Sequence, residues 1–324
     1  MKVAVTGGAG YLGSALVSRL LEEDYGVLSV DNLRRGDYGV LKRLEGDPRL
    51  RLVVADIRDR TRLEEVFRDF GEVEVIFHLA AIPGLKLCRE NPEEAIEVNI
   101  LGTFNVLEVA RRLDIRRVVF ASSAAVYGVP LRLPVVEEDP LRPTNLYGVT
   151  KLAGERLVSL YHENYGVEMV TLRFGNIYGV GVFTRWDTVI PRFVRLGLEG
   201  KPLTIYGDGG SSRDFVHVWD AVEALRLSAE AGGEGVDGEV FNVGGETMRV
   251  KDLAEIVGEE VRRRVGIPVG VAYLPPRVGE VREFTYSLEK IKERLGFHPR
   301  RTIKEAVGEL IDYYLKTKGK EVGF

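Results

Sequence analysis

The stretch "NLYGVTKLAGERL" places a phenol and an amine four residues apart, at Tyr147 and Lys151. Residues at this spacing lie on one face of a helix, so both side chains can contact the same ligand. A lysine ammonium near a phenol favours the phenolate, so we expect the pKa of Tyr147 to fall from about 10 towards neutrality. The phenolate would act as a general base, and Lys151 could hydrogen-bond a ribose. On its own, the pair is more typical of an ordinary surface helix.

Two hydroxyl groups lie upstream, in "FASSAAVYG", where an apolar run ends. The carboxyl end of a buried strand is the edge at which open α/β sheets bind ligands. There, Ser122 or Ser123 could hydrogen-bond the reacting oxygen and share its proton with the tyrosine. Each serine, taken singly, could instead cap the strand end.

A glycine-rich loop, "TGGAGYLGS", follows the first apolar run and contains Gly7, Gly10 and Gly13. Glycines at this spacing allow a turn with positive φ, close backbone approach to a ligand, and tight packing of a helix on a strand. The N–H groups and the dipole at the helix start suit a dinucleotide pyrophosphate. Spacing alone also fits an ordinary glycine-rich turn, so the context has to decide.

The context is a regular alternation of apolar runs and amphipathic segments that continues to about residue 173. This alternation predicts an α/β fold, namely a Rossmann-type doubly wound parallel sheet with a smaller α/β substrate-binding lobe. Beyond Arg173 the alternation weakens, although "RDFVHVWDAVEALRLSAE" reads as a strand and helix that return to the sheet. We therefore expect residues 1–172 and 213–243 to form the sheet domain, and residues 173–212 and 244–324 to form the smaller lobe.

Acidic residues end the second and third apolar runs. Asp31 lies about 20 residues after the glycine loop, where a dinucleotide fold places an acceptor for the adenosine ribose hydroxyls, so it favours NAD. Arg34 and Arg35 could accept the 2′-phosphate of NADP, but the carboxylate at position 31 would repel it. Asp56 is a candidate for the adenine amino group, or alternatively an N-cap for the helix that follows.

Taken together, the motifs resemble the extended short-chain dehydrogenase/reductase family, and within it the sugar-nucleotide 4-epimerases. The resemblance covers nearly the whole chain. It rests on TGGAGYLG, DNL, HLAA, VNILGT, SSAAVYG, YGVTK, LRFGNIYG, RDFVHVWD and FNVGG.

The resemblance implies that Tyr147 is the catalytic base, Lys151 its partner and ribose ligand, and Ser123 the hydroxyl that positions the sugar oxygen. Asn99 would be the family's structural asparagine near the site, and Lys86 either approaches the cofactor or is a solvated loop lysine. The implied NAD contacts are Gly7, Gly10, Tyr11, Leu12, Gly13, Asp31, Asn32, Asp56, Ile57, Leu79, Ala80, Ala81, Lys86, Asn99, Ser122, Tyr147 and Lys151.

The substrate implied by the resemblance is a nucleotide sugar. Arg213 and Arg277 would neutralise its diphosphate, unless they are solvated surface arginines. Tyr206 could stack on the base, and Glu280 stands where many relatives carry an aspartate on the nucleotide ribose. The implied substrate contacts are Ser123, Tyr147, Asn176, Val189, Tyr206, Arg213, Arg277 and Glu280, with Val189 contributing through its backbone.

Two alanines decide which reaction we expect. Relatives that dehydrate or decarboxylate a hexose usually carry an acid just after the catalytic Ser or Thr, whereas this chain has Ala124 and Ala125. The resemblance then implies a UDP-glucose 4-epimerase that interconverts UDP-galactose and UDP-glucose through a 4-keto sugar. The alternatives are a 4-epimerase or reductase for another nucleotide sugar, such as a UDP-N-acetylhexosamine or UDP-glucuronate, and a non-catalytic sensor.

Composition sets the remaining expectations. The 324 residues carry a net charge of −4 with scattered basic residues and no long apolar run, so we expect a cytoplasmic protein that binds neither nucleic acid nor membrane. The single Cys88 and four dispersed histidines predict no disulfide and no metal. The absence of glutamine suggests a heat-adapted protein. The apolar faces in EEAIEVNILGTFNVLEVARRL and KLAGERLVSLYHENY would form a homodimer interface, or else belong to the core.

Overall fold

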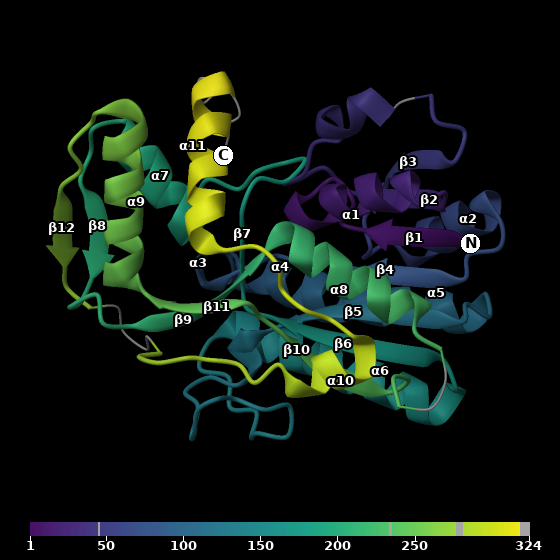
Figure 1. The fold of residues 1–324 in the computed structure, drawn as a ribbon. Coiled ribbons are helices and arrows are strands. Elements are labelled where there is room, and N and C mark those ends of the chain that lie inside the picture. Colours follow the sequence, from purple (N-terminus) through teal and green to yellow (C-terminus); the bar gives the residue numbers. More distant parts are fainter. Residues whose placement is uncertain (45, 233–234, 277–280, 318–324) are drawn as a thin grey trace.

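The computed structural model describes residues 1–44, 46–232, 235–276 and 281–317. Its largest element is a seven-stranded parallel sheet in the order β10-β6-β5-β4-β1-β2-β3 (Figure 1). This confirms the predicted Rossmann-type sheet. The strands are β1 Lys2–Thr6, β2 Gly26–Asp31, β3 Leu50–Val54, β4 Val75–His78, β5 Arg117–Ser123, β6 Glu168–Phe174 and β10 Glu239–Val243.

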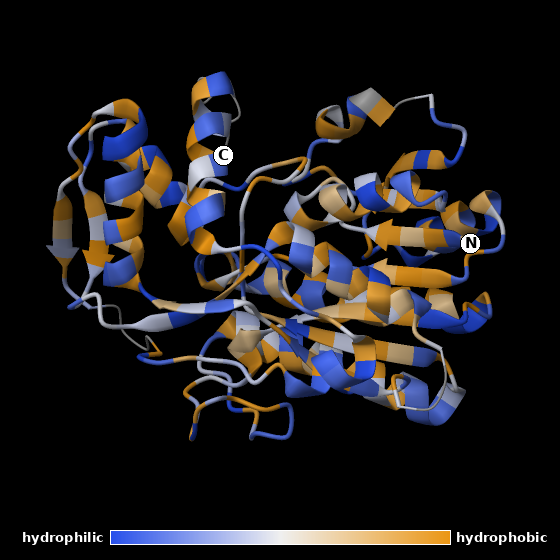
Figure 2. Cartoon of the chain, in the orientation of Figure 1, coloured by the Kyte–Doolittle hydropathy of each residue, from blue (hydrophilic) through white to orange (hydrophobic). Residues whose placement is uncertain are grey.

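Helices cover both faces of this sheet, which explains why its strands read as continuous apolar runs. Val3 and Val5 of β1 join one core cluster and Ala4 joins the other, so successive side chains enter opposite layers. In Figure 2 the strands are accordingly orange and the outer sides of the helices blue. One layer holds α1 Tyr11–Glu22, α8 Val218–Glu230 and α10 Glu289–Leu295; the other holds α2 Arg60–Phe70, α5 Thr103–Arg112 and α6 Leu146–Tyr165.

Several short helices lie in the segments that connect the strands and the long helices along the chain. They are the 3₁₀ helices η1 Tyr38–Leu44 and η3 Ala124–Val126, the α-helices α3 Leu85–Glu90 and α4 Pro92–Ile96, and the π-helix η2 Glu97–Gly102. The segments α4, η2 and α5 follow one another without a break, so the chain from 92 to 112 forms one bent helical rod.

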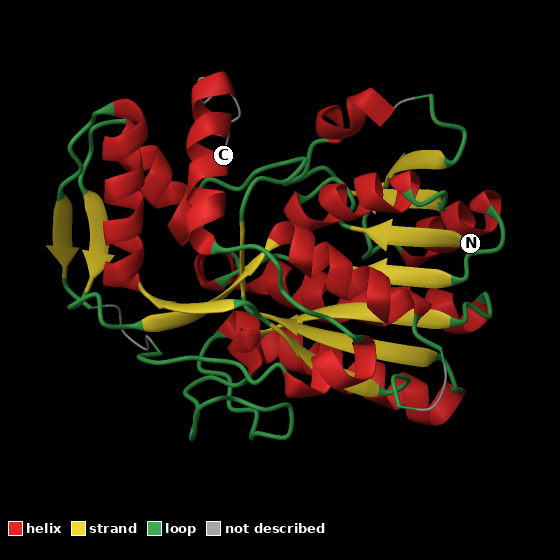
Figure 3. Ribbon diagram, viewed as in Figure 1, coloured by secondary structure: helices red, strands yellow, loops and turns green. Residues whose placement is uncertain are grey.

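A smaller lobe lies beside the carboxyl ends of the central strands, towards which the arrowheads point in Figure 3. Helices α7, α9 and α11 form its core with the buried Trp186, Leu203 and Ile205. Its elements are β7 Asn176–Tyr178, α7 Val189–Leu198, β8 Leu203–Tyr206, β9 Ser212–His217, β11 Glu246–Arg249, α9 Val250–Val265, β12 Val271–Leu274 and α11 Ile303–Thr317.

Two elements, β9 and α10, do not belong to the part of the protein to which the predicted domain boundaries assign them. Strand β9 pairs with β7 and β11 in a separate three-stranded sheet, not with the central sheet. Helix α10 packs on the sheet domain, where Ile291 and Leu295 are buried in the main core, although the prediction placed it in the smaller lobe. Both differences arise from long-range packing, and the exact division of the chain remains a prediction.

Candidate active site

The glycine loop brings the start of α1 against the ends of β1 and β4. Gly7 has a φ of +76°, and a side chain there would lie 2.8 Å from the Ala80 nitrogen. A side chain at Gly13 would collide with the carbonyl of Gly7. Gly10 is the N-cap of α1 and supplies no side-chain cap, so the first-turn N–H groups of the helix suit an anion.

Tyr11 and Leu12, between Gly10 and Gly13, tie this loop to the rest of the protein. The Tyr11 hydroxyl donates a 2.7 Å hydrogen bond to the Gly179 carbonyl, next to β7 of the smaller lobe. Burial raises the pKa of this phenol well above its usual range, so it stays a neutral donor. Leu12 packs against the main core. Their side chains therefore hold the loop, and a contact with a cofactor would come from their backbone.

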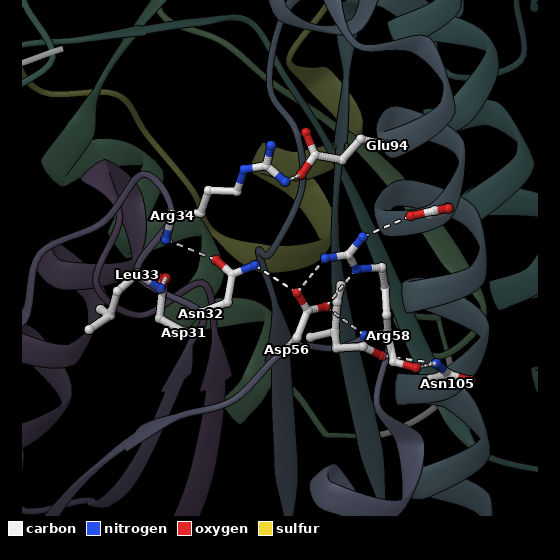
Figure 4. A network of polar contacts seen from close by, with 10 residues as sticks. Asp31, Asn32, Leu33, Arg34, Asp56, Arg58, Glu94 and Asn105 are labelled. Atoms are coloured by element: carbon white, nitrogen blue, oxygen red, sulfur yellow. Dashed lines mark hydrogen bonds and ion pairs between the residues drawn. The ribbon is translucent and has the colours of Figure 1, made fainter.

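The adenosine end of the predicted site contains Asp31 and Asp56 (Figure 4). Asp31 accepts hydrogen bonds from the backbone nitrogens of Ala9 (3.1 Å) and Leu33 (2.8 Å), and burial raises its pKa. Burial would also raise the pKa of Asp56, but hydrogen bonds from Arg58 and Asn32 lower it to about 2. The expectation that Asp56 could instead cap a helix is wrong, because Asp59 caps α2.

The end of β4 is fixed by a buried histidine that the sequence argument did not use. His78 lies between the hydroxyls of Thr6 (2.8 Å) and Thr103 (3.0 Å), and burial lowers its pKa to about 3. It is therefore a neutral structural group. The following residues Leu79 and Ala80 donate backbone hydrogen bonds to Thr6, which places them beside Gly7. Ala81 continues this segment, and the carbonyl of the buried Ile57 is held by Asn105.

Asn99 clamps that segment to the helix carrying the Tyr–Lys pair. Its side chain hydrogen-bonds both backbone groups of Ile82, at 2.7 and 3.1 Å, and donates to the Thr150 hydroxyl at 3.0 Å. Thr150 in turn donates to the Tyr147 carbonyl at 2.9 Å. Because all these groups are used within the protein, Asn99 positions the site and is not itself presented to a cofactor.

Tyr147, Ser123 and Lys151 come together at the carboxyl end of β5. The Tyr147 hydroxyl is hydrogen-bonded to Ser123. Lys151 is buried, and its ammonium donates to the Ala121 carbonyl at 2.8 Å and lies 5.1 Å from the Phe120 ring. The sequence spacing thus placed the right groups at one edge.

The expected direction of the Tyr147 pKa is wrong in this structure. Burial raises the pKa to about 12, and the hydrogen bond from Ser123 offsets only part of that rise. Burial also lowers the pKa of Lys151 to about 8. Burial of both groups outweighs the favourable charge that their spacing suggested, because desolvation penalises the phenolate and the ammonium alike.

The two serines point in different directions. Ser123 faces Tyr147, whereas the Ser122 hydroxyl donates to the Glu155 carboxylate at 2.5 Å. Glu155 forms a buried ion pair with Arg173 at 2.8 Å. Ser122 therefore belongs by its side chain to a buried polar network, and any cofactor contact it makes would be through its backbone.

The predicted substrate residues spread along the smaller lobe. Asn176 is exposed and donates to the Asp214 carbonyl at 3.1 Å, and Arg213 donates to the carbonyls of Ser212 and Val281, each at 2.7 Å. Tyr206 ends β8 and Val189 begins α7, both partly exposed. Arg277 and Glu280 lie outside the described residues. Lys86 is exposed beside Glu90, 3.9 Å away, which agrees with the alternative of a solvated lysine.

One residue near Tyr147 was missed. The charge of Arg185 lowers the pKa of Tyr147 and of Tyr11, so its guanidinium lies within electrostatic range of both phenols. It is held by Asp187 in a two-pronged pair, with distances of 2.9 and 2.6 Å. The segment "FTRWD" carries no motif, and only an unexplained arginine next to "WDTVIPRF" could have drawn attention to it.

The parallel sheet, the glycine loop at a helix start and the Ser–Tyr–Lys group together define a dinucleotide-dependent enzyme of the dehydrogenase/reductase type. The NAD-dependent epimerase/dehydratase family model matches residues 3–244, and the chain belongs to this family. A UDP-glucose 4-epimerase of Mycolicibacterium smegmatis is 33% identical over 316 residues, covering 97% of this chain and 98% of that protein.

Two solved structures show the same architecture. The UDP-glucose 4-epimerase of Thermotoga maritima with UDP-glucose has a TM-score of 0.88 at 31% identity, covering 98% of this chain and 100% of the other. The UDP-glucuronic acid 4-epimerase of Bacillus cereus, in complex with UDP-glucuronic acid and NAD, has a TM-score of 0.88 at 30% identity, covering 98% and 99%. The cofactor of the family is NAD, as predicted.

The residues present fit NAD. The side-chain-free cradle of Gly7, Gly10 and Gly13 leaves room for a pyrophosphate at the start of α1, and Asp31 offers carboxylate oxygens at the end of β2. None of the described helices combines the length and apolarity needed to cross a membrane.

The burial of Lys151 leads to a prediction about stability. Its folded-state pKa of about 8 lies below the unfolded value, so the folded protein is penalised fully below pH 8, and the penalty disappears above about pH 10.5. We expect Lys151→Met to stabilise the fold by about 3 kcal/mol at pH 7 and by roughly 2 kcal/mol less at pH 9.5. Urea unfolding at both pH values measures this difference.

Lys86→Met provides the matched control, because the Lys86 side chain is 78% exposed and its removal is expected to leave unfolding unchanged. A Lys151→Met protein less stable than the parent at pH 7 would show that the hydrogen bond to Ala121 outweighs the cost of burying the charge.

Proposed function

We propose that this chain is a UDP-glucose 4-epimerase, which interconverts UDP-galactose and UDP-glucose. The observation that supports this best is the grouping of Ser123 and Tyr147 with the buried Lys151 at the carboxyl end of β5, at the sheet edge next to the glycine loop. Such a site can remove a proton from a sugar hydroxyl beside a hydride acceptor. The family relationship and the relatives that act on UDP-glucose support the same substrate class.

In the proposed reaction, Tyr147 takes the proton of the sugar 4-hydroxyl while Ser123 holds the same oxygen by a hydrogen bond. NAD, when bound, supplies the chemistry of reversible hydride transfer at carbon 4. The charge of Arg185 favours the phenolate form of Tyr147, and Lys151 is a buried cation one helical turn further along α6. Because both the hydride and the proton return to the 4-keto sugar to give either epimer, the reaction involves no net oxidation.

Epimerisation also requires the 4-keto sugar to turn over while the nucleotide stays fixed. Arg213 suits the role of anchor, because two backbone carbonyls orient its guanidinium before a diphosphate arrives. We include Asn176, Tyr206 and the backbone of Val189 in this nucleotide site. Arg277 and Glu280 complete it on the strength of the family resemblance alone.

The acids around the site support redox chemistry without elimination. Ala124 and Ala125 follow Ser123 in η3, so this turn offers no second proton donor. Glu155 is held by Ser122 and Arg173. A dehydratase or decarboxylase would need a free carboxyl group at this place, and these residues do not provide it.

A second candidate is a UDP-glucuronate 4-epimerase, and the observation in its favour is Arg185. A hexuronate carries a carboxylate next to the reacting carbon, and a guanidinium close to the Tyr147 hydroxyl is suited to pair with it. Arg185 would have to leave Asp187, whose carboxylate is half exposed and can be solvated by water. The B. cereus relative acts on this sugar.

The two candidates separate when the purified protein is given UDP-galactose, UDP-glucuronate or UDP-N-acetylglucosamine with NAD and the epimers are quantified. We expect fastest turnover of UDP-galactose and a loss of at least about 10³-fold in kcat for Tyr147→Phe, since the base is removed. Tyr165→Phe, at an exposed tyrosine on the same helix, is the control and is expected to retain activity. Preference for UDP-glucuronate would establish the second candidate; no turnover of any of these sugars would contradict both.

We also propose that the enzyme is a homodimer. Five large apolar residues remain 47% to 54% exposed on the rod 92–112 and on α6, and a second copy of the same helices could cover them. They are Ile96, Leu101, Val149, Leu160 and Tyr165.

Leu160→Glu is therefore expected to convert the dimer to a monomer, because two charges would be buried across the symmetric interface. Sedimentation equilibrium measures the mass. Leu315→Glu is the matched control, because Leu315 is equally exposed but lies on α11 in the other lobe. A parent protein that is already monomeric at micromolar concentration would refute the proposal.

Heat adaptation is the remaining part of the proposal. Glu108 joins Arg111, Arg112 and Tyr161 in one network between α5 and α6, the kind of arrangement favoured at high temperature. We expect a thermal unfolding midpoint well above the roughly 45–65 °C of mesophilic domains. A calorimetric midpoint within that range would contradict heat adaptation.

A further inference from the structure

Arg34, which follows the predicted ribose-binding residue Asp31, already forms an ion pair with a carboxylate that is distant in the sequence. Arg34 lies three residues after Asp31, and its guanidinium forms an ion pair with Glu94 of α4. Figure 4 shows the Arg34 side chain extending away from Asp31 and Asn32 towards Glu94. The pair joins the loop after β2 to the helical rod 92–112.

Glu94 has little else to compensate its charge. Its side chain is only 11% exposed, and both carboxylate oxygens are buried without a hydrogen bond from any residue that the structure describes. A buried carboxylate that loses its cation is left with its full desolvation cost. Arg34 therefore cannot turn away from Glu94 without a penalty.

The second arginine at this end of the site is occupied in the same way. Arg58 donates two hydrogen bonds to Asp56, at 3.0 and 2.9 Å, and one to Glu97 at 2.7 Å. The carboxylates of this region thus take up both guanidinium groups drawn in Figure 4. A phosphate entering between these groups would meet acidic side chains and two arginines, Arg34 and Arg58, that already have carboxylate partners.

This arrangement bears on the choice between NAD and NADP. The two cofactors differ by a phosphate on the adenosine ribose, and an arginine next to the ribose-binding acid is the group that usually accepts it. We propose that Glu94 is a specificity-determining residue: by holding Arg34, it removes one of the two arginines after Asp31 that could otherwise bind the 2′-phosphate. The Asp31 carboxylate repels the 2′-phosphate, and Glu94 keeps the Arg34 guanidinium from binding it. The inference concerns the cofactor end alone and does not depend on which sugar reacts.

The test is Glu94→Gln, which keeps the size of the side chain and removes its charge. NAD and NADP dissociation constants are measured by calorimetric titration of the cofactor-stripped protein, with no sugar present. We expect NADP to bind at least about tenfold tighter to Glu94→Gln than to the parent, while NAD affinity changes less than about threefold. The gain in NADP affinity should shrink as the salt concentration is raised, because it depends on a solvent-exposed ion pair between Arg34 and the 2′-phosphate.

Two further variants assign the effect to Arg34. Glu97→Gln removes a neighbouring carboxylate that pairs with Arg58, and it is expected to give no such gain. In the double variant Glu94→Gln/Arg34→Gln the gain should vanish. An equal gain in Glu97→Gln would show that only the net charge matters, and an equal gain in the double variant would show that Arg34 is not the group that binds the phosphate. Either result would overturn the role of Arg34.

The single variant Arg34→Gln keeps the proposal testable if Glu94→Gln does not fold, as judged by circular dichroism. In the otherwise unchanged protein Arg34 is already engaged, so its removal should leave the weak NADP affinity within about threefold. A marked fall in NADP affinity would show that Arg34 serves the phosphate despite Glu94, and the inference would be wrong. No gain in a folded Glu94→Gln protein would have the same meaning.

Discussion

The attachment of α6 to the sheet is the constraint on which the site depends, because this one helix carries both Tyr147 and Lys151. The buried ion pair between Glu155 of α6 and Arg173 of β6 fixes the middle of the helix. Asn99 fixes its first turns through Thr150 and at the same time holds the segment that follows β4. A buried pair of this kind is costly to break, since the remaining charge would be uncompensated. Helix α6 and the segment that follows β4 are therefore held in a fixed position relative to each other.

The same burial that fixes the helix works against the chemistry it carries. Lys151 is kept as a buried ammonium with a lowered pKa, and Tyr147 is kept as a phenol with a raised pKa. An apolar side chain at position 151 would be more stable in this buried position, so Lys151 lowers the free energy of unfolding, a cost that is typical of functional sites. Ser123 and Arg185 act in the opposite direction and lower the pKa of the phenol. The pKa of Tyr147 thus reflects two opposing effects: burial raises it, and the nearby polar groups Ser123 and Arg185 lower it.

Local patterns in the sequence were sufficient for the sheet, the glycine loop and the Ser–Tyr–Lys group, because helical spacing and strand ends determine which side chains share an edge. They were insufficient wherever a distant partner decides. Nothing in the sequence distinguishes Ser122 from Ser123. In the structure, Ser122 differs because its hydroxyl hydrogen-bonds the buried Glu155. The reversed shift of the Tyr147 pKa comes from burial, which no motif contains. Helix α10 reads as part of the smaller lobe until Ile291 is seen in the main core.

The adenosine end shows why charges near one another in sequence are poor guides to ligand charge. Arg34 follows Asp31 directly enough to suggest a phosphate site, yet its partner Glu94 comes from a separate helix 60 positions along the chain. Arg58 lies two residues from Asp56 and pairs with it, but also reaches Glu97 on the same helical rod. A guanidinium contributes to ligand binding only through the donors that its protein partners leave free. In the proposal, the rod 92–112 affects cofactor recognition by supplying the acids that pair with these arginines, while Asn99 on the same rod positions helix α6.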